Sequence, residues 1–189
     1  MTRIEEYKAL LKSRLSDYRY THSLCVAESA VELAERYGAD KEKALVAGLL
    51  HDITKESDIN EHFELFAEGG ASLTELERVN AKLWHAMSGA EYIRLKLNIT
   101  DKEIYDAVRY HTTARAGMSL LEKVIYIADF ISADRVYDDV EIVRDLAEKS
   151  LDETMLYTQR YSINELLQKG ACIHPDSVAC YNELLLTEG

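Results

Sequence analysis

The sequence predicts an all-α fold, and three observations support this. One proline and eight glycines occur in 189 residues, and the glycines fall mostly between apolar-periodic segments, so little interrupts helix formation. Apolar residues recur along the chain at helical spacing. A Ser, Thr or Asp followed three residues later by Glu, the pattern of a capping box, precedes several of these segments. We therefore expect a helical bundle, and the length suits a single domain over residues 1–189.

Three helices are expected in the first 55 residues. Capping residues at a helix start accept its free N–H groups, and glycine at a helix end can adopt a left-handed conformation. In chain order the helices follow the capping residue Thr2, cover about residues 21–37 up to Gly38, and run from the capping residue Asp40 to about Ile53.

The middle of the chain predicts four further helices by the same signals. They run from Asp58 to about residue 68 before a Gly-Gly pair, start again after Ser72, cover about residues 84–97, and extend from Thr100 to His111.

The last part of the chain predicts four more helices. Ser119 and Glu122 cap a strongly apolar helix over 120–131, and proline is favoured at the first helical position. The other three cover about 139–149 and 151–169 and begin at Pro175.

Composition excludes several classes of function. The formal net charge of −12 argues against a general nucleic-acid surface, because phosphate backbones attract Lys- and Arg-rich faces. No apolar run approaches the ~18 residues of a membrane span, and the N-terminus lacks a signal-peptide pattern, so we expect a cytoplasmic protein without membrane contact. Cys25, Cys172 and Cys180 lack CxxC spacing and are expected to be buried free thiols.

The most chemically loaded stretch is the end of the third predicted helix, where His51 and Asp52 follow an apolar run. Desolvated polar groups at the edge of a core need partners, and a metal ion satisfies both. His22 at a helix start and Asp129 inside an apolar helix are the other candidates. Imidazole and carboxylate ligands suit Fe, Mn, Zn or Co. Taken singly, each histidine has the alternative of a capping or surface role, and Asp129 that of an ion pair with Arg135.

The order His22, His51-Asp52, Asp129 resembles that of the HD-domain metal-dependent phosphohydrolases. The resemblance implies that these four residues hold a metal between helices. It also implies that His85 and His111 hold a second metal with Asp52 as the bridge. Two alternatives remain for that histidine pair: contact with phosphate without a metal, or an ordinary structural role.

Flanking residues narrow the resemblance to the symmetrical dinucleoside tetraphosphate hydrolases of the YqeK type. Ala114 and the run Ser132-Ala133-Asp134 depart from the family pattern, which has Gly and a Glu-Pro step there, and we expect them to affect loop shape and substrate choice rather than the metal ligands. The matching segments are residues 19–23, 51–55, 84–86, 111–113, 119–129 and 173–175.

This resemblance implies an enzyme that splits diadenosine tetraphosphate (Ap4A) symmetrically into two ADP, with a divalent transition metal, iron first and Mn, Co or Zn as alternatives. The rivals are another HD phosphohydrolase acting on nucleotides or cyclic dinucleotides, and a non-catalytic nucleotide- or metal-binding helical module. The expected partner is a small dinucleoside polyphosphate or nucleotide, and a homodimer is one option for the assembly.

The resemblance also assigns residue roles. Lys55, His85 and His111 are the expected catalytic residues. For Arg19 and Arg135 a solvated surface charge is the alternative, and for residues 173–175 a simple stop before the last helix is. Tyrosines such as Tyr137 could stack an adenine, although core packing is the commoner role. The expected substrate-binding residues are Arg19, His22, Asp52, Lys55, His85, His111, Thr112, Asp129, Arg135, Ile173, His174 and Pro175.

Overall fold

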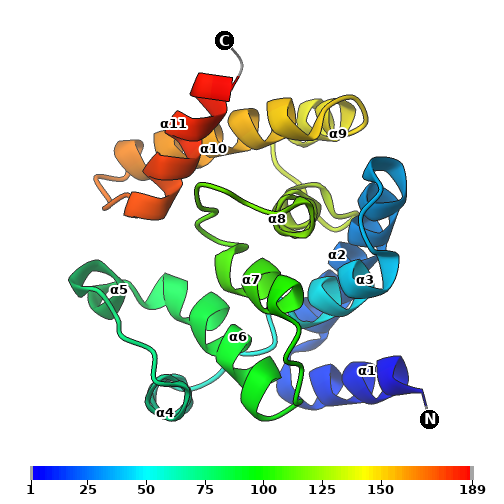
Figure 1. Cartoon of the computed structure of the whole chain (residues 1–189), viewed down its shortest axis with the longest axis vertical. Helices are drawn as coiled ribbons and strands as arrows, with labels where there is room; N and C mark the ends of the chain where they lie inside the picture. Colours follow the sequence, from blue (N-terminus) through cyan, green and yellow to red (C-terminus); the bar gives the residue numbers. More distant parts are fainter. Residues whose placement is uncertain (1, 188–189) are drawn as a thin grey trace.

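The computed structural model describes residues 2–187 and confirms the all-α prediction: this part of the chain holds eleven α-helices, one short 3-10 helix and no β-strand (Figure 1). The helices are α1 (Arg3–Arg14), α2 (Asp17–Tyr37), α3 (Lys41–Leu50), α4 (Ile59–Gly69), α5 (Glu75–Val79), η1 (Ala81–Leu83, 3-10), α6 (Trp84–Leu95), α7 (Lys102–Tyr110), α8 (Leu120–Ile131), α9 (Val140–Ala147), α10 (Leu151–Gln168) and α11 (Pro175–Thr187).

Helix α8 lies at the centre of the molecule and is seen nearly end-on in Figure 1. It packs against α2, α3, α7, α9 and α10. The reason is its composition, since Val124, Ile125 and Ile127 are completely buried and Tyr126 nearly so. Burying apolar side chains on all sides of one helix requires neighbours on all sides. Any polar residue on this helix therefore lies close to several other elements.

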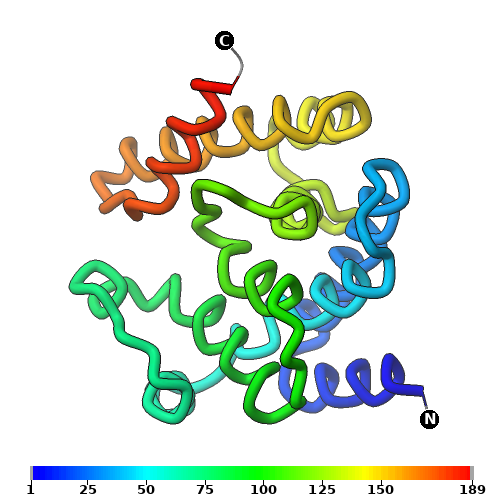
Figure 2. Tube along the Cα trace, in the orientation of Figure 1, coloured from blue at the N-terminus to red at the C-terminus, as the bar shows by residue number. Residues whose placement is uncertain are grey.

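The chain path in Figure 2 brings distant segments together around that central helix. The pair α2 and α3 lies on one side, α6 and α7 on another, and α9 to α11 cover a third. Helix α4 packs on α6, and α1 covers α3 at the N-terminal end of the chain. In the described part of the chain, no helix is both long and apolar enough to cross a membrane.

Helices α2 and α3 approach unusually closely at Gly48. A Cβ atom on Gly48 would lie 2.8 Å from the Cα atom of Ala27, a separation that real side chains essentially never show. Only glycine therefore permits this contact. The close approach matters for the site, because α2 carries His22 and α3 ends at His51.

Most predicted helix starts are confirmed. Thr2, Asp40, Asp58 and Ser119 each accept a backbone N–H at the start of the expected helix. Pro175 is the first residue of α11. Local sequence signals decided these boundaries because capping groups act within one turn.

Three predicted starts are wrong. Helix α2 begins at Asp17 and not at Thr21, because Ser16 caps it; His22 therefore lies in its second turn. The cap of α5 is Thr74, which forms a full capping box with Glu77, and not Ser72. The cap of α7 is Asp101, whose carboxylate accepts two backbone N–H groups, in place of Thr100.

The prediction of three buried thiols is wrong for two of them. All three cysteines are free, but only Cys180 is buried; Cys25 is half-buried and Cys172 is exposed. Cys172 lies in the short loop between α10 and α11.

Candidate metal centre

Three histidines are held with one ring nitrogen fixed and the other directed inward. His51 Nδ1 donates to the Gly48 carbonyl at 2.7 Å, and His111 Nδ1 donates to the Val108 carbonyl at 2.7 Å. His22 Nδ1 donates to Asp134 Oδ2 at 2.8 Å. Because Nδ1 of His51 and of His111 donates to a carbonyl, Nε2 of each ring presents a lone pair, which is the form that ligates a metal. His22 differs: burial alone would lower its pKa, but its hydrogen bond to Asp129 outweighs burial and raises that pKa, so a metal must displace a proton from this ring.

Asp52 lies at the meeting point of the imidazoles. Its Oδ1 atom is 3.3 Å from His85 Nε2 and 3.5 Å from His111 Nε2, and its Oδ2 atom is 3.7 Å from His51 Nε2. The Nε2 atoms of His85 and His111 are themselves 3.1 Å apart. One carboxylate thus faces three histidines that come from α3, α6 and the end of α7.

Asp129 lies beside His22 at the other end of this cluster. Its Oδ1 atom is 3.0 Å from His22 Nε2, and it pairs with the guanidinium of Arg135. Arg135 also donates to the Asp129 carbonyl at 2.7 Å. The ion pair with Arg135, raised above as an alternative for Asp129, is therefore present together with the contact to His22.

Two triads in the described part of the chain bring their ligand atoms within 4.8 Å of one another: His22, His51 and Asp129, and His51, Asp52 and His111. His51 belongs to both. Its Nε2 atom and Asp52 Oδ1 are buried without any hydrogen-bond partner. Such orphaned buried atoms are costly in a protein interior, and a shared cation would satisfy both. The donor set therefore fits one divalent metal and offers ligands for a second.

The ionisation states of His51, His85, Asp52 and Asp129 suit metal binding. Burial lowers the pKa of His51 to about 4 and holds the pKa of His85 well below its ordinary value. Burial alone would raise the pKa of the Asp52 carboxyl, but the neighbouring imidazoles and Lys55 hold that pKa well below its usual range. The same balance applies at Asp129, where His22 and Arg135 outweigh burial. Neutral imidazoles and ionised carboxylates are the ligand forms that a transition metal requires.

Cations and a hydroxyl surround the Asp52 end of the cluster. Lys55 Nζ is 2.9 Å from His85 Nε2 and 3.4 Å from Asp52 Oδ1. Arg19 Nη1 donates to Asp52 Oδ2 at 3.3 Å. Thr112 Oγ1 lies 3.3 Å from the Nε2 atoms of both His85 and His111. These predicted substrate-binding residues are therefore brought together.

Residues 173–175, also predicted to bind substrate, lie at the start of α11 and not among the groups around Asp52. His174 lies against Glu77, at 3.4 Å, and its Nδ1 accepts from the backbone N–H of Asp176 at 3.1 Å. It thus caps the start of α11. Ser177 Oγ donates to the Thr113 carbonyl at 2.7 Å, so this helix start lies next to the loop that follows His111.

Sequence inspection missed Asp134, which was noted only as part of a departure from the family pattern. Its carboxylate orients His22, and Ser132 Oγ in turn donates to it at 2.8 Å. An acidic residue directly before Arg135, in the loop after Asp129, was the available signal. Thr54 was missed as well; its hydroxyl donates to the His85 carbonyl at 2.9 Å.

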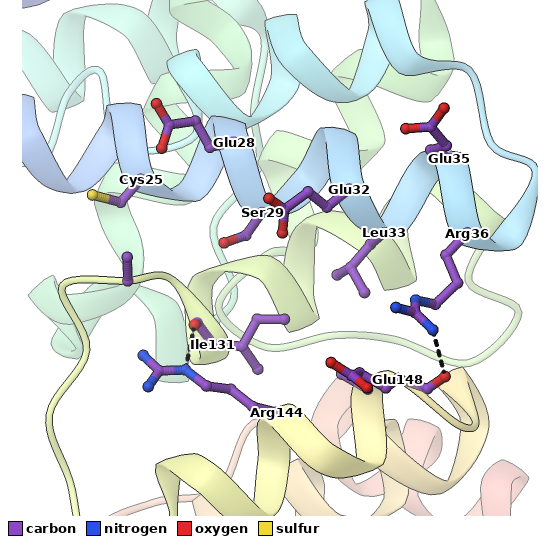
Figure 3. A pocket seen from close by; sticks show the side chains of 12 residues that line it. Cys25, Glu28, Ser29, Glu32, Leu33, Glu35, Arg36, Ile131, Arg144 and Glu148 are labelled. Carbon is purple, nitrogen blue, oxygen red and sulfur yellow. Dashed lines mark hydrogen bonds between the residues drawn. The ribbon is translucent and has the colours of Figure 1, made fainter.

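A cavity of about 770 Å³ between α2 and α9 lacks the chemistry of this centre. Figure 3 shows glutamates along α2, with Arg36 on the same helix and Arg144 on the facing helix α9. Each arginine donates to a backbone carbonyl, Arg36 to that of Glu148 and Arg144 to that of Ile131. Four glutamates, Glu28, Glu32, Glu35 and Glu148, line it. Their carboxylates disfavour an anionic substrate.

Comparison with known proteins agrees with the geometry of the cluster. Residues 19–134, more than half of the chain, match the model of the HD domain, and the matched span includes every residue of the two triads. The chain belongs to the HD-domain family. That membership implies a divalent metal at the histidine and aspartate cluster.

Full-length relatives define the family more narrowly. The chain is 39% identical over 181 residues to the symmetrical bis(5'-nucleosyl)-tetraphosphatase of Bacillus subtilis (strain 168), covering 96% of this chain and 97% of that one. It is 34% identical to the protein of the same name from Staphylococcus aureus (strain NCTC 8325), covering 95% and 93%. The chain belongs to the family of symmetrical bis(5'-nucleosyl)-tetraphosphatases.

A solved structure shares the fold. It is a predicted HD superfamily hydrolase involved in NAD metabolism from Clostridium acetobutylicum, with a TM-score of 0.95, 33% sequence identity and 99% coverage of both chains. The helical arrangement described above is therefore that of the HD superfamily.

Proposed function

We propose that this protein hydrolyses diadenosine tetraphosphate symmetrically and releases two ADP. The observation that carries the proposal is the pair of triads joined through His51, with Asp52 facing the other histidines. The relatives named for this activity match nearly the whole chain at 34–40% identity. The proposal treats residues 1–189 as one domain, which one continuous hydrophobic core drawn from Tyr7 to Leu184 supports.

His22, His51, Asp52 and Asp129 would hold one divalent metal, and Asp52, His85 and His111 would hold a second. A transition metal bound there would supply Lewis-acid activation of water and of a phosphoryl group. We propose iron as the native metal, with manganese, cobalt or zinc as substitutes, because this donor set mixes imidazole nitrogen and carboxylate oxygen.

The chain's own cations would carry much of the electrostatic work. Lys55 is held against Asp52 and His85, so its ammonium group is positioned before substrate binds. Negative charge that develops on the transferred phosphoryl oxygens and the leaving diphosphate would be stabilised by this fixed charge. Arg19 pairs with Asp52 at one end of the cluster, and Arg135 pairs with Asp129 at the other end. Each guanidinium can also bind phosphate oxygens with two N–H groups.

Further residues would position the nucleotide. Thr112 Oγ1, close to His85 and His111, can donate to a phosphate oxygen. Ile173, His174 and Pro175 stand at the start of α11, and we propose that the His174 imidazole contacts the nucleotide. Ser177, in the first turn of the same helix, donates to the Thr113 carbonyl and holds this helix start beside the loop after His111, which supports a substrate role for residues 173–175.

The proposed activity has a direct test. Protein loaded with Fe²⁺ or Mn²⁺ is incubated with diadenosine tetraphosphate, ATP and a cyclic dinucleotide, and the products are separated by anion-exchange chromatography. ADP as the sole product from the tetraphosphate supports the proposal. AMP together with ATP would indicate asymmetric cleavage and contradict it, and preferential turnover of a cyclic dinucleotide would favour the rival HD activity. Absence of turnover in every arm would favour a non-catalytic binding module.

Two further predictions complete the proposal. We propose a cytoplasmic location, and cell fractionation with an antibody tests it. A homodimer is the assembly we test for by light scattering during gel filtration.

A further inference from the structure

A second cavity, of about 460 Å³, opens beside the metal centre. Its volume lies within the ~300–1,000 Å³ typical of small-molecule sites. Four aromatic residues contributed by three helices and a loop line it: Tyr18 of α2, Phe130 of α8, Tyr161 of α10, and Tyr137 of the loop after α8. None of these residues was needed to account for metal binding.

The cavity is continuous with the catalytic cluster. Asp129 and Arg135 both line it, and Asp129 Oδ1 is 3.0 Å from His22 Nε2. From the other side, the Arg19 guanidinium lies 5.5 Å from the Tyr18 ring and donates to Asp52. A ligand in the cavity would therefore be linked to the metal centre through two arginines.

The walls suit a flat aromatic group. The rings of Tyr137 and Tyr161 lie with centroids 5.6 Å apart, and the Tyr137 hydroxyl donates to the Phe130 carbonyl at 3.1 Å, which fixes the ring. Tyr18 is 60% exposed and Val136 is 93% exposed. Exposed apolar groups at the mouth of a cavity are commonly covered by a ligand. Nucleobases stack on such rings through their π-faces.

The charges favour the neutral end of a nucleotide. Asp129 and Asp134 line the cavity, and both are already paired, Asp129 with Arg135 and Asp134 with His22. Carboxylates at the wall would repel a polyphosphate but would not repel a base or a ribose. They can accept hydrogen bonds from the ribose hydroxyls. Burial raises the pKa of Tyr137 to about 12, so its phenol stays neutral.

We propose that this tyrosine cavity, formed by Tyr18, Phe130, Tyr137 and Tyr161, binds one of the two nucleosides of the substrate. The inference rests on the proposed function. Symmetrical cleavage places the central phosphate bridge at the metals, so two equal nucleoside diphosphate halves must leave the centre in different directions. One half can follow the cations on the Asp52 side, and the other extends past Asp129 and Arg135 into the cavity.

The test compares a substrate with two nucleosides against one with a single nucleoside. We measure kcat/KM for diadenosine tetraphosphate and for adenosine 5'-tetraphosphate, with wild-type protein and the Tyr18→Ala and Tyr161→Leu variants. Tyr161→Phe retains the ring and Leu167→Ala removes an exposed apolar side chain from the same helix outside the cavity. Metal content, measured for each variant, is expected to be unchanged.

Loss of a stacking surface is expected to lower kcat/KM for the dinucleotide about tenfold, mainly through a higher KM. The kcat/KM for adenosine tetraphosphate is expected to stay within about twofold of the wild-type value. Leu167→Ala is expected to behave like wild type, and Tyr161→Phe, which keeps the ring, is expected to lose less kcat/KM for the dinucleotide than Tyr161→Leu. An unchanged ratio between the two substrates in both tyrosine variants, with wild-type turnover intact, would overturn the cavity assignment alone. Absence of wild-type turnover of diadenosine tetraphosphate would overturn the proposed function and, with it, this inference.

Discussion

The two ends of the metal centre differ in how they meet solvent. At the enclosed end, formed by Asp52, His85 and His111, the side chains are 3%, 5% and 1% exposed. At the open end, formed by Asp129, Asp134 and Arg135, they are 20%, 15% and 30% exposed. His51, completely buried, contributes to both. The enclosed end thus depends on internal pairing, and the open end faces the tyrosine cavity.

The two ends also differ in the group that orients the histidine ring: a backbone carbonyl for His51 and His111, and a carboxylate for His22. Backbone carbonyls of Gly48 and Val108 hold His51 and His111, so the acceptors of these two bonds do not depend on the side chain at position 48 or 108. His22 is held by the carboxylate of Asp134, which a substitution can remove. The enclosed end is therefore set by helix geometry, and the open end is tunable.

The largest effect is expected from Asp52→Ala, which removes the carboxylate facing the imidazoles. Three imidazoles, Lys55 and Arg19 would lose the carboxylate that they share, so we expect metal content to fall to background and activity to drop by about 10³-fold or more. Elemental analysis and the ADP assay measure both. The exposed Glu64→Gln variant of α4 serves as the matched control, and an Asp52→Ala protein that keeps metal and activity contradicts the site.

The second-largest effect distinguishes one metal ion from two. His85→Ala and His111→Ala alter only the enclosed end, so we expect the metal-to-protein ratio to fall from about two towards one and activity to drop about 100-fold. Titration with Mn²⁺ followed by electron paramagnetic resonance gives the ratio. A ratio that neither substitution changes would show that the enclosed end holds no second ion.

A smaller effect is expected at the open end from Asp134→Asn. The amide accepts the His22 Nδ1 proton less strongly than a carboxylate does, and loss of a carboxylate that orients a histidine ligand typically weakens metal binding by ~10–100-fold. Competition with a chelator measures the affinity. The neighbouring Asp138→Asn, on an exposed side chain, is the control. Equal chelator resistance in the two variants would show that Asp134 does not support the centre.

The smallest effect is expected from Gly48→Ala. The Gly48 carbonyl orients His51, the histidine that belongs to both triads. The new methyl group would press α3 away from Ala27, and overpacking of this kind costs about 1–3 kcal/mol. We expect thermal melts to shift down by several degrees and the metal content of both ends to fall. Gly89→Ala, whose Cβ would be 3.4 Å from its nearest neighbour, is the control. Equal melting of the two variants would contradict the role of Gly48.

Local signals account for what could be predicted about individual helices. Thr2, Asp40 and Ser119 cap their helices because a capping group acts on N–H groups within one turn. Where two candidate caps lie close together, as Ser72 and Thr74 do, the choice depended on Glu77, which forms the box with Thr74 and also pairs with Arg109. The tertiary contact and the local signal reinforce each other there.

The sequence by itself determined an all-helical chain and the residue types of a transition-metal site, because periodicity, caps and ligand chemistry are properties of nearby residues. Only the tertiary structure decided that His22, His51 and Asp129 meet, that Asp134 orients His22, and that Tyr18, Tyr137 and Tyr161 form one cavity. These groups are separated by up to 143 positions, from Tyr18 to Tyr161. Their proximity depends on how α2, α8 and α10 pack, and packing is a property of the whole core.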